Sequence, residues 1–421
     1  MIGRLEFLET ADVIGRRLCR DALWAGGRCN WLGWGAEPQQ HAWAPAYQAC
    51  PGDLYEGTAG ISLFLARLYR FTGDRYERKA LEGAVNHVLS QISKIEPRFR
   101  IGFFSGATGA AYALTEAGRV LEHDTLIRRA LDELHGLRNH PLDASMVDVI
   151  VGCAGAIPAL IDVGQRFDRQ ELVDLAVRYG EHLLGLACKT AEGWSWDTMG
   201  TPGLPHLTGF AHGAAGVVTA LLEVYRVTQD DRFVEAARQG LCFERSHFSA
   251  AHGNWPDFRE QSRQPNGQPG FLCFWCHGAP GIGMSRLRCW KTLVHDTSLR
   301  DEIEVAIRTT KPTLLRDATA GRGNYSLCHG VGGNSELMML AAEMLGRGEL
   351  AEIAEHVGLA GIEQIEKPGL PWPCGTHGGC ETPNLMTGLA GIGHFYLRLY
   401  DAQAVPSILV LEPSGGKGES A

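Results

Sequence analysis

The sequence predicts an all-α protein, a double-layered ring in which seven helical-hairpin repeats form two concentric layers of helices. Three observations lead to this prediction. A Gly-x-x-Gly step recurs seven times, a pattern typical of an amphipathic helix precedes each step, and a more apolar helix follows it. A repeat of this length forms one unit that cannot bury its apolar face alone, so neighbouring copies share a core. We therefore expect a single domain over residues 1–413.

The glycine steps mark the repeats. Each step begins where an amphipathic pattern has ended, and the spacing between steps leaves room for two helices. Because equivalent positions of a ring of repeats converge, we expect all the steps at one end of the inner layer. The steps occupy residues 57–60, 106–109, 152–155, 213–216, 278–281, 330–333 and 388–391.

The outer layer is predicted from apolar residues that recur with helical spacing. Such residues alternate with polar ones, so these helices are expected to be half exposed. Pro312 is expected to kink or shorten the sixth of them. The predicted ranges are 11–24, 77–92, 125–137, 171–187, 232–243, 299–315 and 350–365.

The inner layer is predicted from segments that are apolar on most sides, such as residues 61–69, 217–225 and 392–400. A helix of this kind is buried. No strand-rich region competes with the helices, and residues 408–411, Ile-Leu-Val-Leu, are too few to change the fold class. Residues 414–421 are expected to form a disordered tail.

Composition narrows the class of protein. The chain has 421 residues, of which 45% are apolar and 21% charged, as in an ordinary soluble protein. A net charge of −9 argues against a nucleic-acid partner, because such proteins normally carry a basic face. Residues 1–10 do not resemble a signal peptide, and no apolar run is long enough to span a membrane. A cytoplasmic location is therefore predicted.

The twelve cysteines are expected to be free thiols or metal ligands, since the chain shows no secretion signal. Cys19, Cys153, Cys188 and Cys242 lie in helical patterns or tight steps, where cysteine acts as a small core residue.

Two motifs, Trp-Cys-His-Gly at 275–278 and Leu-Cys-His-Gly at 327–330, indicate a metal site. At the position two residues before the first glycine, the repeats carry Tyr55, Phe104, Ile150, Ala211, Cys276, Cys328 and Met386. The two cysteines thus belong to the adjacent fifth and sixth repeats. With His329 they make three ligands and leave a fourth place open, which is typical of catalytic zinc.

Two other interpretations of these residues stay open. They could be buried thiols and helix-capping histidines with no metal. Alternatively the zinc could be structural, with Cys273, Cys374, His377 or Cys380 closing the site.

An acid–base pair is predicted on the same rim. His212 stands directly before its first glycine, as His277 and His329 do, but lacks a cysteine neighbour. Asp148 lies four residues before Gly152 and would point to the rim from the third repeat. The alternatives are that His212 caps the inner helix and that Asp148 is an N-cap.

These residues carry a resemblance to the lanthionine synthetase C family, the zinc-dependent lanthipeptide cyclases, and most of all to the C-terminal cyclase half of the two-domain class II synthetases. The similar segments are residues 209–216 (GFAHGAAG), 275–283 (WCHGAPGIG), 326–334 (SLCHGVGGN), 381–399 (ETPNLMTGLAGIGHFYLRL) and 405–413 (VPSILVLEP). The resemblance covers essentially the whole chain, and these motifs are specific together. The resemblance implies an α/α toroid, in agreement with the seven repeats.

The resemblance also implies an activity. It places Zn²⁺ ligands at Cys276, Cys328 and His329, an acid/base histidine at His212 and an aspartate at Asp148. The implied reaction adds a cysteine thiol to dehydroalanine or dehydrobutyrine of the same precursor peptide and forms a thioether ring. Some single-domain cyclases have a tyrosine where this chain has His277, so the role of position 277 is left open.

The resemblance implies partners as well. The substrate would be a dehydrated precursor peptide, the dehydratase would act in trans, and an export transporter is a candidate partner. Two rival functions remain: addition of glutathione to dehydroamino acids, as in the eukaryotic relatives, and a non-catalytic zinc scaffold that binds a peptide or a dehydratase. A protein prenyltransferase subunit fits the metal but not the motifs.

Overall fold

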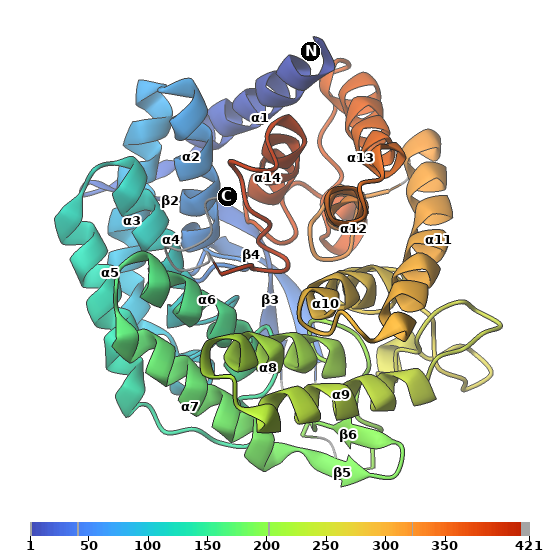
Figure 1. Cartoon of the computed structure of the whole chain (residues 1–421). Helices are drawn as coiled ribbons and strands as arrows, with labels where there is room; N and C mark the ends of the chain where they lie inside the picture. Colours follow the sequence, from blue (N-terminus) through green and yellow to red (C-terminus); the bar gives the residue numbers. More distant parts are fainter. Residues whose placement is uncertain (1, 40–41, 201–202, 322, 414–421) are drawn as a thin grey trace.

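The computed structural model describes residues 2–39, 42–200, 203–321 and 323–413, and it confirms a double ring of helices (Figure 1). The inner layer consists of α2 (Thr58–Thr72), α4 (Ala107–Val120), α6 (Cys153–Arg166), α8 (Ala214–Thr228), α10 (Ala279–Thr292), α12 (Val331–Leu345) and α14 (Leu389–Tyr400). The outer layer consists of α1 (Ile2–Asp21), α3 (Arg75–Gln91), α5 (Asp124–Gly136), α7 (Gln170–Leu186), α9 (Asp231–Ser246), α11 (Thr297–Ala320) and α13 (Gly348–Gly361).

The ring is closed by the two ends of the chain. Each inner helix packs against the outer helix that follows it, from α2 with α3 to α12 with α13. The last inner helix, α14, packs instead against α1 (Figure 1). α1 thereby completes the seventh pair. It starts at Ile2, nine residues before the range predicted from its apolar pattern.

Glycine steps begin all seven inner helices, as predicted, and the first glycine of each step is the N-cap. The second glycine has a steric role. A Cβ on Gly109 would lie 1.7 Å from the carbonyl oxygen of Phe103, and one on Gly333 would lie 1.8 Å from that of Leu327. The same close approach to the carbonyl six residues earlier recurs in every step. Only glycine, which has no Cβ, allows the first helical turn to pack this closely against the segment that precedes the helix.

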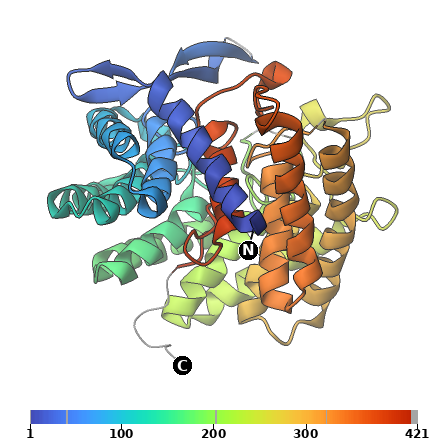
Figure 2. The same ribbon diagram turned by 90° about the horizontal axis from the view of Figure 1, so that it is seen from above.

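Three antiparallel two-stranded sheets interrupt the helices and were not predicted. They are β1–β2 (Leu23–Ala25 and Arg28–Asn30), β3–β4 (Leu32–Gln39 and Ala42–Ala49) and β5–β6 (Cys188–Thr190 and Gly193–Ser195). Figure 2 shows the N-terminal strands at one end of the ring. Two strands cannot enclose a core of their own, so the all-α class stands.

The C-terminal segment 405–411 lies in the middle of the inner ring (Figure 1). Residues 408–411, too few to alter the fold class, are all buried and line a small cavity with Phe103, Val149 and Phe210. The indole Nε1 of Trp275 donates to the carbonyl oxygen of Leu409 at 3.1 Å. The segment therefore completes the core of the toroid. The predicted disordered tail, 414–421, lies outside the described residues.

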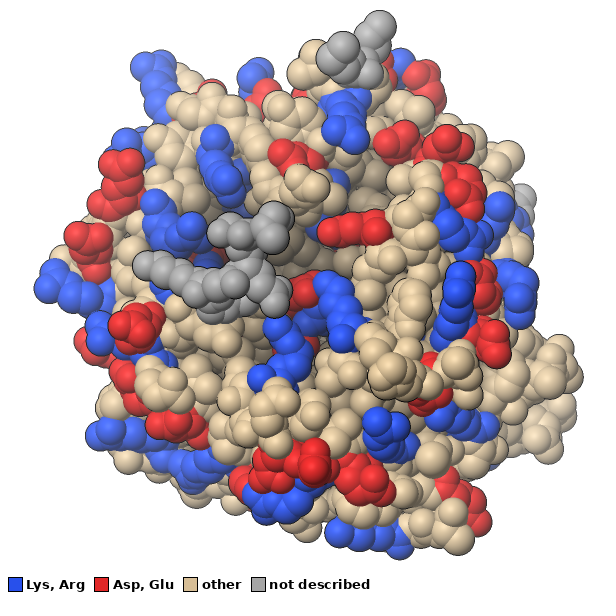
Figure 3. Space-filling model, viewed as in Figure 1, with Lys and Arg blue, Asp and Glu red and all other residues tan. Residues whose placement is uncertain are grey.

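Ion pairs whose side chains are at most 14% exposed join neighbouring inner helices. Arg166 of α6 pairs with Glu116 of α4, Arg288 of α10 with Glu223 of α8, and Arg398 of α14 with Glu336 of α12. These three pairs involve six of the seven inner helices. In the remaining inner helix, α2, Arg67 donates to the carbonyl oxygen of Pro406 at 3.1 Å. Outside this core, acidic and basic side chains are interspersed over the face seen in Figure 3.

Several details differ from the sequence predictions. Pro312 does not end α11, which has 24 residues and continues to Ala320. Packing against both α10 and α13 supports the helix on either side of the proline. Cys153 is buried as expected, but Cys188 and Cys242 are exposed. None of the helices in the described ranges is both long and apolar enough to cross a bilayer.

The central segment supports a stability prediction. Leu409 is 2% exposed, so Leu409→Ala should lower the free energy of unfolding by about 2–5 kcal/mol through lost burial and a residual cavity. Leu359→Ala on the outer face of α13, 37% exposed, is the matched control and should cost less than about 0.5 kcal/mol. Urea unfolding monitored by tryptophan fluorescence measures both; equal losses would show that the segment does not support the core.

Candidate active site

The segments that precede the seven inner helices are joined by a closed ring of backbone hydrogen bonds. The position two residues before each first glycine takes part in every link, directly or through its neighbour. The bonds run from Tyr55 N to Phe104 O (2.9 Å), Phe104 N to Ile150 O (3.2 Å), Val149 N to Ala211 O (3.0 Å), Ala211 N to Cys276 O (3.2 Å), Cys276 N to Cys328 O (3.4 Å), Cys328 N to Met386 O (2.9 Å) and Met386 N to Tyr55 O (3.1 Å). The expected convergence of the repeats at one rim is thereby confirmed.

Cys276 and Cys328 are neighbours in this ring, and their thiols contact each other. The hydrogen bond between the two sulfurs, followed by burial, raises the pKa of Cys276. The same bond lowers the pKa of Cys328 against the opposing effect of burial, and a hydrogen bond from the Tyr55 hydroxyl lowers it further. Of the two thiols, Cys328 is therefore the one that loses its proton more readily.

His329 is oriented by a backbone carbonyl. Its Nε2 lies 2.9 Å from the carbonyl oxygen of Gly375, which can only accept, so Nε2 carries the proton and the lone pair is on Nδ1. Metal-ligating histidines are commonly oriented by a carbonyl in this way.

These three side chains fit zinc by the chemistry of their donors. Two thiols are held together and one imidazole has its tautomer set by its second nitrogen, which is a donor set that zinc prefers. Across the ranges that the structure describes, however, no three His, Cys, Asp or Glu side chains form a compact metal-binding group as they stand. A metal ion would have to draw His329 and the thiols closer together.

Of the additional ligands considered for a closed structural site, Cys374 and Cys273 contact groups outside the proposed ligand set. Cys374 is buried and its thiol lies 4.0 Å from the carbonyl oxygen of Thr382, whereas Cys380 is exposed. Cys273 contacts Thr310 and Thr313 of α11. Their loop contributes instead through the Gly375 carbonyl, a contact that cysteine spacing does not reveal.

His212 and Asp148 meet, as the spacing suggested. The imidazole Nδ1 lies 2.5 Å from Asp148 Oδ2, and the carboxylate is buried. Burial lowers the pKa of His212, but the charge of Asp148 and its hydrogen bond outweigh burial, so the pKa is raised overall. Asp148 also accepts from the Val151 backbone N–H at 2.8 Å. It therefore both holds the turn that precedes the step and orients His212, while the N-cap of α6 is Gly152.

His277 is buried beside His212, and their rings stack with centroids 5.7 Å apart. Burial first, and then the charge of Arg259, lower the pKa of His277 to about 3. Neither ring nitrogen has a hydrogen-bond partner among the described residues. The His277 side chain is therefore uncharged and lines the site.

Arg259 is a site residue that the sequence did not reveal. It lies in the long connection between α9 and α10, where it pairs with Asp257 through Nε (3.0 Å to Oδ1) and Nη2 (2.8 Å to Oδ2). Its charge acts on Cys276, Cys328, His212 and His277. A guanidinium held in this way is a fixed cation at the rim.

The chain is similar to several known proteins. A family model described as lanthionine synthetase C-like protein matches residues 48–410. The lacticin 481/lactococcin biosynthesis protein LcnDR2 of Lactococcus lactis subsp. lactis is 22% identical over 381 residues, which cover 88% of this chain. The alignment spans only 38% of that protein's length.

Two further relatives cover more of their own length. The Danio rerio protein named glutathione S-transferase LANCL1 is 23% identical over 380 residues, 83% of this chain and 82% of that protein. The solved structure of nisin cyclase superposes with a TM-score of 0.59 at 16% identity, over 85% of this chain and 91% of nisin cyclase. The latter likeness shows a shared fold.

The carbonyl contact to His329 supports a prediction about metal affinity. A Cβ on Gly375 would lie 2.7 Å from His329 Nε2 and 2.7 Å from Ser326 Oγ, so Gly375→Ala should displace the imidazole. We expect zinc affinity to fall about 10- to 100-fold, as measured by competition with a chromogenic chelator. Gly348→Ala, where a Cβ meets nothing within 4 Å, is the control. Unchanged affinity in both variants would argue against His329 as a ligand.

Proposed function

The chain belongs to the lanthionine synthetase C-like family, and on that basis we propose that it is a zinc-dependent lanthipeptide cyclase. Its substrate would be a dehydrated precursor peptide, in which cysteine thiols add to dehydroalanine or dehydrobutyrine to form (methyl)lanthionine rings. One observation carries the proposal: two thiols from adjacent repeats and a carbonyl-oriented histidine share a rim with a separate His–Asp pair.

The proposed ligands are Cys276, Cys328 and His329. Zinc bound there would lower the pKa of a substrate thiol and hold it as a thiolate at neutral pH. Two thiolates and a neutral imidazole would balance the charge of the ion, and one coordination place would remain for the substrate.

His212 is proposed to move the proton. Because its Nδ1 donates to Asp148, the Nε2 lone pair is available to accept a proton from the substrate thiol. The sulfur then forms a bond to the β-carbon of the dehydroamino acid, and the electron pair of the C=C bond moves to give an enolate. The same Nε2–H protonates the α-carbon, so no proton is gained or lost overall. Asp148 stabilises the imidazolium between the two steps.

Arg259 is proposed to stabilise the enolate. The negative charge of this intermediate resides largely on the carbonyl oxygen of the dehydroamino acid. A guanidinium fixed by Asp257 requires little reorganisation when that charge develops, which is the condition for effective electrostatic stabilisation. His277, being neutral and buried, would exclude water from this side of the site.

The dehydroamino acids themselves must come from a reaction that removes water from serine and threonine. We propose that a dehydratase supplies them, in trans or as a further domain. A second candidate function is addition of glutathione to dehydroamino acids, which the similarity to the protein named glutathione S-transferase LANCL1 favours.

A thiol count separates these functions. The zinc-loaded protein is incubated with a dehydrated, cysteine-containing precursor peptide, and remaining thiols are alkylated and counted by mass spectrometry. We expect loss of alkylatable thiols with the wild type and a fall of about 10²- to 10⁴-fold in rate with His212→Ala, because a general acid–base is removed. Cys328→Ala should also abolish ring formation.

The outcomes are distinct. A mass increase by glutathione, with peptide thiols left free, would favour the second candidate. Peptide binding without loss of thiols, in the presence of bound zinc, would support a scaffold and contradict both enzymatic functions.

The pH profile tests the His–Asp pair. Neutral His212 is required as the base, so kcat/KM should rise with pH through the raised pKa of His212. Asp148→Asn removes the charge that raises this pKa, so the rising limb should move to lower pH while the maximal rate falls. Asp143→Asn, an exposed carboxylate that bonds Ser145, is the control and should leave the profile in place. A shift to higher pH in Asp148→Asn would contradict the assignment.

A further inference from the structure

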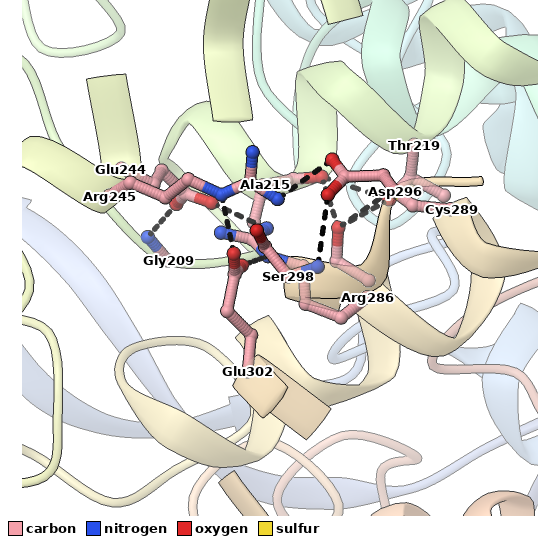
Figure 4. Close-up of polar contacts among 11 residues, drawn as sticks. Gly209, Ala215, Thr219, Glu244, Arg245, Arg286, Cys289, Asp296, Ser298 and Glu302 are labelled. Carbon is pink, nitrogen blue, oxygen red and sulfur yellow. Dashed lines mark hydrogen bonds and ion pairs between the residues drawn. The ribbon is translucent and has the colours of Figure 1, made fainter. Parts of the chain in front are cut away.

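An ion pair buried behind the site takes no part in the proposed reaction. Glu244 of α9 and Arg286 of α10 are both fully buried, and Arg286 Nη1 lies 2.7 Å from Glu244 Oε2 (Figure 4). Arg286 also pairs through Nε with Glu302 of α11. Two outer helices and one inner helix are therefore joined by a charged contact inside the protein.

The contact continues outward to the surface. Arg245 of α9 donates to Glu302 Oε1 at 2.5 Å and pairs with Asp296 at 2.9 Å. Asp296 in turn caps α11 by accepting from the Ser298 N–H at 3.1 Å. These outer members are partly exposed, so only the Glu244–Arg286 end is removed from water.

The buried end contacts the segment that carries His212. Glu244 Oε1 accepts from the backbone N–H of Gly209 at 3.0 Å, as Figure 4 shows. Gly209 has a φ of +100°, and a Cβ there would lie 3.2 Å from the carbonyl oxygen of Cys276. Only glycine suits both the backbone conformation and the close approach. The segment thus lies flat against the backbone of Cys276, three residues before His212.

Ala211 continues this contact. Its N–H donates to Cys276 O at 3.2 Å and its carbonyl accepts from Val149 N at 3.0 Å, one residue after Asp148. The position of the Gly209–His212 segment therefore sets how His212 faces both Asp148 and the thiols. At its upstream end the Glu244 side chain accepts from the Gly209 N–H, and the Ala215 N–H donates to the Gly209 carbonyl at 3.2 Å.

We propose that Glu244 and Arg286 are positioning residues for the acid–base step: Arg286 fixes the Glu244 carboxylate, and Glu244 holds Gly209 and thereby His212. This inference rests on the proposed function. A buried ion pair is often no more stabilising than apolar residues of the same size, so stability alone gives little reason for its presence. Precise placement of a reacting group does give a reason for the ion pair, since small displacements of such a group reduce rates strongly.

The test compares Glu244→Gln with Glu244→Met. The two side chains are similar in size and neither is charged, but only glutamine keeps an oxygen that can accept from Gly209 N. We expect Glu244→Met to lower kcat about 10- to 100-fold, with KM and zinc content unchanged, and Glu244→Gln to retain kcat within about three-fold.

The Arg398–Glu336 pair provides a matched control. It joins two inner helices, its side chains are 3% and 1% exposed, its nitrogen and oxygen atoms lie 2.9 Å apart, and among the described residues it does not contact a rim segment. The double variant Glu244→Leu with Arg286→Met should lose kcat, whereas Glu336→Leu with Arg398→Met should keep kcat within about two-fold even if its melting temperature changes. Melting temperatures of all variants identify any that fail to fold.

A readout without substrate separates the two proposals. The imidazole NMR signals of His212 should shift in Glu244→Met and stay in place in Glu244→Gln and in the control pair. If the wild type forms no rings but the signals follow this pattern, the positioning role stands and the proposed function fails. If Glu244→Met and Glu244→Gln behave alike, or the control pair lowers kcat equally, the positioning role is wrong.

Discussion

The closed ring of backbone hydrogen bonds at the rim is the constraint on which the rest of the structure depends. It passes through all seven repeats and returns to Tyr55, so no repeat can shift without breaking two links. It requires the incoming segment to lie against the first turn of the inner helix, which is why every step has a second glycine. The steps are therefore the structural device that brings side chains from distant repeats into one plane.

The two ends of the inner ring of helices differ in their contacts and in their proposed roles. At the rim, the inner helices begin, and the side chains of the proposed chemistry stand on short segments between helices. At the other end, Arg–Glu pairs and the C-terminal segment join the same helices. Trp275 connects the two ends, because it belongs to the motif that carries Cys276 and its indole reaches Leu409. The inner helices are thus joined at both ends, by backbone hydrogen bonds at the rim and by side-chain pairs away from it.

Electrostatics divide the rim into roles. Asp148 favours the charged form of His212, whereas burial and Arg259 keep the stacked His277 neutral. Of the two stacked imidazoles, one is thereby favoured in its charged form and the other in its neutral form. This arrangement avoids a buried pair of like charges. Arg259 is in turn neutralised by Asp257, so its field acts locally.

The sequence by itself determined the ring of seven repeats, the starts of the inner helices and the adjacency of Cys276 and Cys328, and it placed His212 and Asp148 on the same rim. These follow from positions counted within one repeat, and a repeated unit places equivalent positions side by side. Only the tertiary structure decided the contacts of Gly375 with His329, of Glu244 with Gly209 and of Arg259 with the site. They join a backbone atom or a loop residue to a distant partner, and no period in the sequence marks such a pair. The closure of the ring by α1 and α14 and the C-terminal segment in its core belong to the same class, because chain ends have no following repeat to place them.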